Sequence, residues 1–395
     1  MSTPTLFFDP TNLLELDGID HLESTRPTPN PFWNRARLEL AWKLPVMAGI
    51  TDSDKVELHQ MRLASREELE IFHDRSYIET MELFSNMGTA FASRFGLDSQ
   101  ECPVFREMDK YASYPVGTTI DATMDVAEGR FDTAFSLFGG FHHALESQAG
   151  GFCYYNDCVI ALKRYREKYP EKKVLYLDTD VHHGNGTQQA FYNDQNVLTI
   201  SMHELSLGFY PGTGRPEENG AGEGEGYSVN IPLPPLTDDY EFWRAFEELV
   251  VPIWLEYKPD LIFWEVGADG HKEDPLADMM LTLDTYRRLA LTVKQLTNLG
   301  TKKLVAVGGG GYNPVVTAKV WTILLSDLAG VSLPALLPAE WIQLCRNYDL
   351  QVKRGGWTDR PTKMNCENEP NISRAVDDTI QKVKELIFPV FGLEQ

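Results

Sequence analysis

Short apolar runs separated by helical patterns restrict the fold of this chain more than any other feature of its sequence. The runs lie at 134–138, 174–177, 197–200, 261–266 and 304–307. Apolar residues recur with helical spacing at about 157–169, 239–257, 283–299 and 314–328. Continuous apolar strands that alternate with helices are typical of a parallel sheet with both faces covered. The sequence therefore predicts an α/β fold with a mostly parallel sheet flanked by helices on both faces.

Length and composition favour one large domain. The chain has 395 residues, of which 43% are hydrophobic, enough for a large core. Length alone permits two or three domains, but no proline- and serine-rich linker, internal repeat or low-complexity segment divides the sequence. We therefore expect a single domain over 1–395, with 331–395 packed on it as a C-terminal extension.

Charge and cysteine content exclude several classes of protein. The formal net charge is −22, whereas general nucleic-acid binding requires a basic surface. The five cysteines follow no spacing pattern, which indicates a reducing compartment without structural disulfides. The chain shows no signal-peptide pattern, and no apolar run reaches the roughly 18 residues that span a bilayer. We expect a cytoplasmic protein that binds neither membranes nor nucleic acid.

Groups suited to metal binding and proton transfer follow each predicted strand. They lie at 139–143 (Gly-Gly-Phe-His-His), 178–183 (Asp-Thr-Asp-Val-His-His), 207–214, 267–271 (Gly-Ala-Asp-Gly-His) and 308–312 (four glycines and a tyrosine). In open parallel sheets, ligands bind beyond the carboxyl ends of the strands. Because all five segments occupy such ends, the sequence predicts that they form one site together.

Asp180, His182 and Asp269 are the candidate metal ligands of this site. Three protein ligands with an open fourth position are typical of a catalytic zinc centre, and iron(II) suits the same donors. His271 repeats the Asp-x-His spacing and could be a fourth ligand, but four protein ligands would close the site. We therefore favour a place for His271 at the rim or behind the ligands. His183 is expected to pack beside the ligands rather than bind the metal.

The remaining groups suit the hydrolysis of an acyl compound. The tandem His142 and His143 can supply a base for water and an acid for the leaving group. Asp178 is placed to orient one of these imidazoles. Tyr312, which follows four glycines, can place its hydroxyl close to a developing oxyanion.

Several motifs together resemble the histone deacetylase family. They are 139–143, 151–157, 178–186, 209–214, 267–269 with 274–276, and 308–312, in the family's order and over roughly 20–330. The C-terminal segment, with 337–341 and a last helix ending at 383–389, is similar to the prokaryotic acetoin-utilization (AcuC-like) branch. The resemblance implies the single-domain arginase/deacetylase fold and zinc-dependent hydrolysis of acetyl-lysine to lysine and acetate.

The resemblance also implies a role for each site residue. Asp180, His182 and Asp269 would hold the metal, His143 would be the general base and acid, His142 would pair with Asp178, and Tyr312 would donate to the substrate carbonyl. The walls of a narrow substrate tunnel would come from Phe152 and Tyr210 beside Gly151, with Leu276 at the rim and Glu101 gripping the substrate backbone. Arg35 would match the arginine that lines the acetate exit.

Structural potassium ions are a further implication of the resemblance. One would be bound by Asp178, Asp180, His182, Ser201 and Met202, and a second near Phe191, Asp194, Val197 and Tyr227.

Two positions depart from the family pattern. Asn185 replaces an aspartate that pairs with the second histidine in one large branch, so we expect His143 to be less basic here. Tyr210 replaces a commoner phenylalanine and adds a hydroxyl at the tunnel mouth.

Other functions share part of this chemistry. The expected substrate is an acetylated protein or peptide, and the alternative is a small acetylated amine or polyamine. The apolar Leu276 disfavours polyamines, because that branch uses an acidic gatekeeper near the tunnel. An arginase-like ureohydrolase would need two manganese ions and a further aspartate that the segment 265–269 lacks. A non-catalytic acetyl-lysine-binding scaffold would have lost Tyr312 or a metal ligand, and this chain keeps them. The sequence leaves the oligomeric state open.

Overall fold

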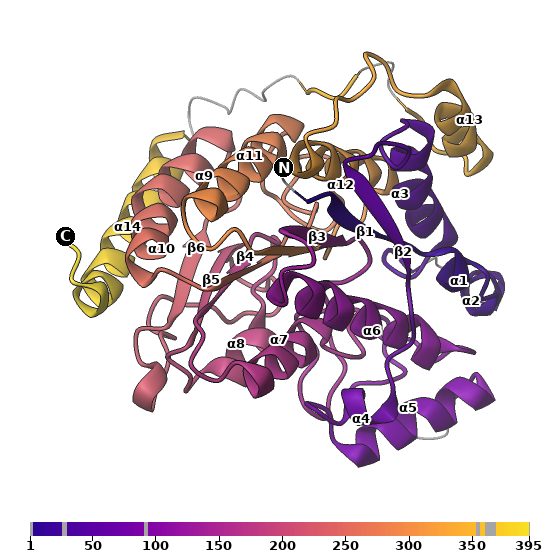
Figure 1. The fold of residues 1–395 in the computed structure, drawn as a ribbon, viewed down its shortest axis with the longest axis horizontal. Helices are drawn as coiled ribbons and strands as arrows, with labels where there is room; N and C mark the ends of the chain where they lie inside the picture. Colours follow the sequence, from indigo (N-terminus) through magenta and orange to yellow (C-terminus); the bar gives the residue numbers. More distant parts are fainter. Residues whose placement is uncertain (1–2, 26–29, 91–93, 353–355, 360–368, 395) are drawn as a thin grey trace.

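One eight-stranded sheet forms the centre of the protein in a computed structural model (Figure 1). The structure describes residues 3–25, 30–90, 94–352, 356–359 and 369–394. The strand order is β2-β1-β3-β8-β7-β4-β5-β6, and every neighbouring pair is parallel. The strands are β1 Thr5–Asp9, β2 Val56–Gln60, β3 Thr133–Ser136, β4 Val174–Asp178, β5 Val197–Glu204, β6 Ser228–Leu233, β7 Leu261–Glu265 and β8 Leu304–Val307.

The five predicted strands are β3, β4, β5, β7 and β8, and their positions confirm the α/β prediction. The strands β1, β2 and β6 lack a long apolar run and were not predicted. The residues of β2 are mostly exposed, as is usual for an edge strand, and β6 forms the other edge and contains Pro232. Proline is tolerated in a sheet mainly at such edges.

Helices cover both faces of the sheet, as predicted (Figure 1). One layer contains α3, α11 and α12, with α9, α10 and α14 continuing it towards β6, and the other contains α6, α7 and α8. The helices are α1 Thr11–Leu14, α2 Gly18–Thr25, α3 Arg35–Met47, α4 Arg66–Leu69, α5 Arg75–Met87, α6 Met108–Ala127, α7 Asp157–Lys168, α8 Asn185–Phe191, α9 Asp239–Ala245, α10 Val251–Tyr257, α11 Leu283–Leu299, α12 Pro314–Ala329, α13 Ala339–Asn347 and α14 Glu369–Phe391. The π-helical turn η2 Phe246–Val250 joins α9 to α10, and η1 Gly222–Gly224 is a short 3-10 turn.

Two helices begin directly after segments that the sequence analysis assigned to the site. The side chain of Asn313, next to Tyr312, accepts hydrogen bonds from the backbone of Val315 and Val316 and so caps α12. Asn156 caps α7 in the same way. Side-chain caps of this kind satisfy backbone N–H groups that have no partner within the helix. They therefore fix where each of these two segments ends and where the helix after it begins.

Among the residues that the structure describes, no helix is both long and apolar enough to cross a lipid bilayer.

Candidate active site

Asp180, His182 and Asp269 meet at the carboxyl ends of the neighbouring strands β4 and β7. One ligand atom from each side chain lies within 4.8 Å of the others. Nδ1 of His182 is 3.2 Å from Oδ1 of Asp180 and 3.1 Å from Oδ2 of Asp269. All three residues are buried. The structure therefore brings together the three metal ligands that the sequence predicted.

The electrostatics of this cluster favour a cation. Burial and the neighbouring Asp180 raise the pKa of Asp269 to about 7. Burial alone would lower the pKa of His182, but its hydrogen bonds with the two carboxylates raise it to about 10. Buried carboxylates that stabilise a positive charge between them fit a divalent metal ion, and two carboxylates with one imidazole suit a transition metal.

Glycines allow the two ligand carboxylates to lie against the backbone. A Cβ atom on Gly267 would overlap Oδ2 of Asp180, and one on Gly310 would overlap Oδ2 of Asp269. The N–H of Gly310 donates to Oδ2 of Asp180 at 2.7 Å. These close approaches explain why glycine occupies both positions.

His142 and His143 lie side by side next to the ligand cluster. Nδ1 of His142 lies 2.8 Å from Oδ2 of Asp178, and Nδ1 of His143 lies 2.8 Å from Oδ1 of Asn185. Both oxygens only accept hydrogen bonds, so each Nδ1 carries the proton and donates. The two Nε2 atoms are 3.1 Å apart and face each other. The pairings of His142 with Asp178 and of His143 with Asn185 are those expected from the sequence.

The two imidazoles differ in basicity. Burial lowers the pKa of His142, but Asp178 and Asp180 outweigh this effect and raise it above the ordinary value. Burial and the adjacent His142 and His182 lower the pKa of His143 well below the ordinary value. His143 is therefore the neutral member of the pair near pH 7.

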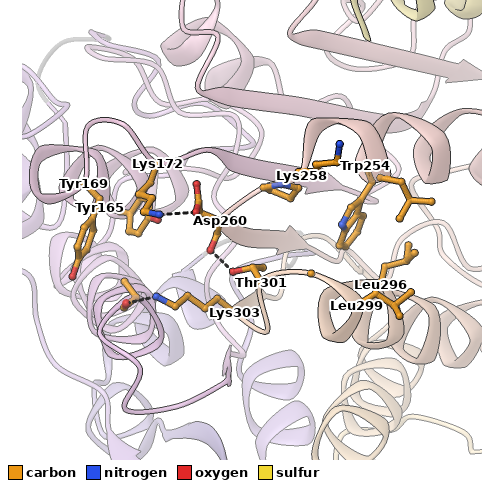
Figure 2. A pocket seen from close by; sticks show the side chains of 14 residues that line it. Tyr165, Tyr169, Lys172, Trp254, Lys258, Asp260, Leu296, Leu299, Thr301 and Lys303 are labelled. Carbon is orange, nitrogen blue, oxygen red and sulfur yellow. Dashed lines mark hydrogen bonds and ion pairs between the residues drawn. The ribbon is translucent and has the colours of Figure 1, made fainter. Parts of the chain in front are cut away.

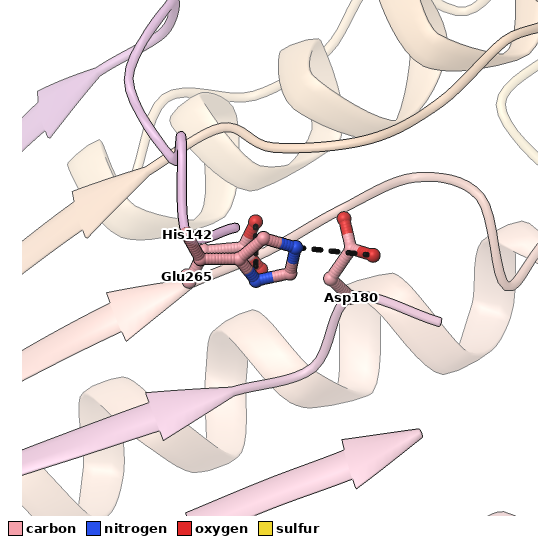
Figure 3. Close-up of side chains that lie close together, drawn as sticks. All are labelled: His142, Asp180 and Glu265. Atoms are coloured by element: carbon pink, nitrogen blue, oxygen red, sulfur yellow. Dashed lines mark ion pairs between the residues drawn. The ribbon is translucent and has the colours of Figure 1, made fainter. Parts of the chain in front are cut away.

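Glu265 is a buried carboxyl that the sequence analysis did not assign to the site. It lies at the end of β7 beside His142 and Asp180 (Figure 3), with Oε1 3.8 Å from Nδ1 of His142. Burial, Asp178 and Asp180 raise its pKa well above the ordinary value. Its closeness in sequence to Gly267 and Asp269 was the available signal. However, Glu265 ends the otherwise apolar strand β7, and nothing in that strand indicated that its carboxyl reaches the site.

Tyr312 follows the glycine segment 308–311 and reaches the same site. Its ring is 6.1 Å from that of His182 and 5.4 Å from that of Phe152. Its backbone N–H donates to Oδ2 of Asp274 at 2.7 Å. Burial, together with Asp269 and Asp180, raises the pKa of its phenol well above the ordinary value. The hydroxyl therefore stays protonated and can donate a hydrogen bond.

Arg37, and not Arg35, is the arginine behind the glycine segment, which corrects the sequence-based assignment. The guanidinium of Arg37 donates to the carbonyls of Gly309 and Gly311, each at 2.7 Å, and is 1% exposed. It lies 4.0 Å from the ring centre of Phe32. Arg35 instead pairs with Asp20 and donates to backbone carbonyls near α1, away from the site.

The physical reason for this error lies in the faces of α3. Arg37 shares a face with Leu40, Ala41 and Leu44, at i+3, i+4 and i+7, and these residues are buried. Spacing of this kind places a residue on the side of a helix that faces the core. The signal was therefore in the sequence, but an arginine on an apolar face is unusual.

Aromatic side chains surround the cluster on several sides. Phe152 lies next to Tyr312, and Tyr210 meets His143 edge to face at 4.9 Å. Phe209, which the sequence analysis did not single out, stacks on His182 at 5.0 Å with an interplanar angle of 4°. The sequence placed Phe152 and Tyr210 beside the site, and the structure adds Phe209.

The predicted rim residues occupy neighbouring loops. Oε2 of Glu101 accepts a hydrogen bond from the N–H of Gly151 at 3.0 Å. Leu276 is 38% exposed and follows Asp274, whose carboxylate holds the backbone of Tyr312. Asp157 lies in the segment 151–157, but the sequence analysis assigned it no role. Its carboxylate accepts from the N–H groups of Gly140 and Phe141 and so fixes the segment before His142.

His271 and His183 lie outside the ligand set. His271 is buried and its Nε2 is 2.6 Å from Oδ2 of Asp359 in the C-terminal segment. His183 contacts Thr213 and Gln188. Both imidazoles therefore bond to groups other than the candidate metal ligands, and their roles beside the site stay predictions.

The residues predicted to bind potassium form two groups. In the first, Asp178 and Ser201 are partners in the register of β4 and β5, and Oγ of Ser201 is 2.9 Å from Nδ1 of His203. Asp180, His182 and Met202 of this group are also buried. The second group surrounds the turn between α8 and β5, where Asp194 faces Arg166 at 3.6 Å. Phe191, Val197 and Tyr227 belong to this second group. Potassium binding at either place stays a prediction.

Comparison with known proteins gives consistent results. A sequence model of the histone deacetylase domain matches residues 32–328. The acetoin utilization protein AcuC of Bacillus subtilis (strain 168) is 37% identical over 336 residues, covering 84% of this chain and 85% of that protein. AcuC of Staphylococcus xylosus is 35% identical over 338 residues, with 84% and 86% covered.

Solved structures with a similar fold include a crystal structure of an HDAC homolog complexed with SAHA, with a TM-score of 0.83. Another is the HDAC homolog from Aquifex aeolicus, with a TM-score of 0.82. Each is 28% identical to this chain, and each comparison covers 97% of this chain and 100% of the other.

Proposed function

The chain belongs to the histone deacetylase family, and from that premise we propose that it hydrolyses the side-chain amide of acetyl-lysine with the help of a bound zinc ion. The products would be lysine and acetate. The observation that carries this proposal is the cluster of Asp180, His182 and Asp269 beside a histidine pair and the ring of Tyr312. Membership of this family supports a hydrolase, and the acetyl-lysine substrate and the zinc ion are our proposal.

Asp180, His182 and Asp269 would hold the ion, which when bound would polarise the acyl carbonyl and lower the pKa of water. The same three side chains also suit iron(II), so the bound metal must be identified together with the activity.

His143 would move the protons. Its Nδ1 donates to Asn185, so Nε2 is left as the acceptor for a proton from the attacking water. As the carbon–nitrogen bond of the amide breaks, the same Nε2–H would give its proton to the departing lysine amine. The low pKa of His143 supports this role, because a base must be neutral before it accepts a proton.

His142 would act as a charged neighbour of the reaction. Its hydrogen bond to Asp178 and its raised pKa favour the imidazolium form. A positive charge next to His143 keeps the pKa of that residue low, which assists the return of the proton to the leaving amine.

Tyr312 would donate a hydrogen bond to the oxygen of the substrate carbonyl as negative charge develops there. The glycine segment that carries it is held from behind by Arg37 and from the side by Asp274. These contacts fix the start of α12 and therefore the position of the phenol.

The proposed substrate is an acetylated protein or peptide. The carboxylate of Glu101 at the rim can accept hydrogen bonds from backbone N–H groups of a peptide, which a small acetylated amine lacks. The exposed apolar Leu276 offers no charge to a polyamine. We therefore expect a higher kcat/KM for an acetyl-lysine peptide than for an acetylated polyamine.

The test is release of acetate from an acetyl-lysine peptide by the purified protein loaded with zinc or with iron(II). We expect turnover that a chelator abolishes and that returns with metal. The variant Asp180→Asn should lose both bound metal and activity. Asp54→Asn, which removes an exposed carboxylate from the turn before β2, should keep both. A metal-loaded protein that folds normally but releases no acetate from either kind of substrate would contradict the proposal.

A further inference from the structure

A cavity lies at the amino ends of the strands, at the opposite end of the sheet from the candidate metal ligands. Figure 2 shows the side chains that line it. Its volume is about 690 Å³. Lys172, Asp260 and Lys303 line it shortly before β4, β7 and β8 begin. The volume is within the range of small-molecule sites, about 300–1,000 Å³. Nothing in the proposed deacetylase reaction uses this cavity.

The apolar part of the lining is aromatic and aliphatic. Figure 2 shows Trp254, Leu296 and Leu299 on one side of the cavity and Tyr165 and Tyr169 on the other. Leu299 is 72% exposed, so a large apolar side chain remains in contact with water at the mouth. A ligand that covered these side chains would gain the free energy of removing apolar surface from water.

The polar part of the lining is basic, in a chain of net charge −22. Lys172, Lys258 and Lys303 line the cavity together with a single carboxylate, that of Asp260. Both oxygens of Asp260 are already bonded, to Nζ of Lys172 at 2.8 Å and to the N–H of Lys173 at 2.9 Å. The acidic group is therefore neutralised by its own neighbours.

The lining offers donors rather than acceptors. The carbonyl of Ala127 accepts from Lys303 at 2.6 Å, and that of Asp260 accepts from Thr301. An ammonium group has three N–H donors, so one bond each leaves Lys172 and Lys303 with two further donors. Among the residues that the structure describes, the side chain of Lys258 pairs with Glu256 alone, at 3.5 Å, and this exposed ion pair holds it weakly.

We propose that this cavity is a binding site for a small organic anion with an aromatic or aliphatic body. The lysine donors would bind the carboxylate, phosphate or sulfonate group, and Trp254, Leu299 and the tyrosines would cover the apolar part. Charge-assisted hydrogen bonds together with apolar burial are what such a ligand requires.

The probe is 8-anilinonaphthalene-1-sulfonate, an aromatic anion whose fluorescence rises when it leaves water. We expect saturable binding to the full-length protein, dominated by one site per chain. Lys258→Glu reverses a cavity charge, and Leu299→Glu adds a negative charge at the mouth. Each should weaken binding about tenfold or more. Both positions are exposed, and thermal unfolding will verify that the variants fold.

Lys110→Glu is the matched control, because it makes the same charge change near the start of α6, whereas the cavity touches the end of that helix. The affinity of the Lys110→Glu variant for the probe should remain within about twofold of that of the unmodified protein. The proposal is wrong if the Lys258 and Leu299 variants bind the probe as tightly as the unmodified protein. It is also wrong if Lys110→Glu weakens binding as much as Lys258→Glu, since the probe would then report net charge alone.

Discussion

The two histidines of the candidate active site have different partners, and this difference sets the charge of each. His142 pairs with the carboxylate of Asp178, which favours a cation. His143 pairs with the neutral amide of Asn185, and burial keeps its pKa low. The sequence alone predicted that Asn185 would leave His143 less basic than an aspartate would.

Replacement of Asn185 by aspartate tests this difference. A carboxylate at that place favours the protonated imidazole, so the pKa of His143 should rise by about one unit or more. Because the general base must be neutral, the acid limb of the pH profile of kcat/KM should move to higher pH by the same amount. An unchanged acid limb in Asn185→Asp would show that another group controls it.

Tyr312→Phe tests the hydroxyl that is proposed to contact the developing oxyanion. Removal of one such donor costs about 10² to 10³ in kcat in other hydrolases, and we expect a loss of about 10²-fold or more here. Metal content should not change, because the phenol is not a ligand. Activity close to that of the unmodified protein would remove Tyr312 from the mechanism.

At the scale of elements, the glycine segment before α12 depends on α3 for its shape. Arg37 donates to two of its carbonyls across the interface between these helices. Removal of this buried guanidinium would leave the two carbonyls without hydrogen-bond partners, which is costly inside a protein.

The pair Arg37→Met and Arg35→Met separates the two arginines of α3. We expect Arg37→Met to lower the free energy of unfolding by about 3 kcal/mol or more and to reduce kcat at least tenfold, because the segment that carries Tyr312 loses its support. Arg35→Met removes the ion pair with Asp20 and two hydrogen bonds to the carbonyls of Leu14 and Leu16. None of these contacts involves the glycine segment, so kcat should stay within about twofold. Denaturant titration and acetate release measure both quantities, and equal effects in the two variants would contradict this account.

Central strands were easier to predict than edge strands for a physical reason. A strand buried on both faces, such as β4, must be apolar throughout. The edge strand β2 has water on much of its surface, and its sequence Val-Glu-Leu-His-Gln lacks this signal. The reactive segments all follow central strands, so the site could be predicted although three strands were missed.

At the scale of the whole molecule, the buried His73 contributes to stability. His73 is buried, with Nδ1 3.1 Å from the carbonyl of Glu146, while its Nε2 accepts from the N–H of Asn156 at 2.9 Å. Burial lowers its pKa from 6.5 to about 4. Asn156 caps α7, so this contact connects α7 to the loop after α4.

The folded protein should therefore lose stability in acid through His73. Between pH 6.5 and 4 the unfolded chain binds a proton at this histidine and the folded chain does not. The free energy of unfolding thus falls as the pH falls, by about 3 kcal/mol over that range. His73→Gln keeps a donor and an acceptor without the titration. Denaturant midpoints measured from pH 7 to 4 should decline less steeply in the variant, and equal slopes would contradict the prediction.

The sequence by itself determined the class of fold and predicted the histidine pair and the cluster of Asp180, His182 and Asp269, because strand burial and the types of side chain that follow each strand can be read from single segments. Only the tertiary structure decided which arginine supports the glycine segment, and that Glu265 and Phe209 join the site. It also decided that lysines before three strands line a cavity at the amino ends of the sheet. Each of these depends on which residues distant in sequence become neighbours, and that follows from how helices and strands pack rather than from any one segment.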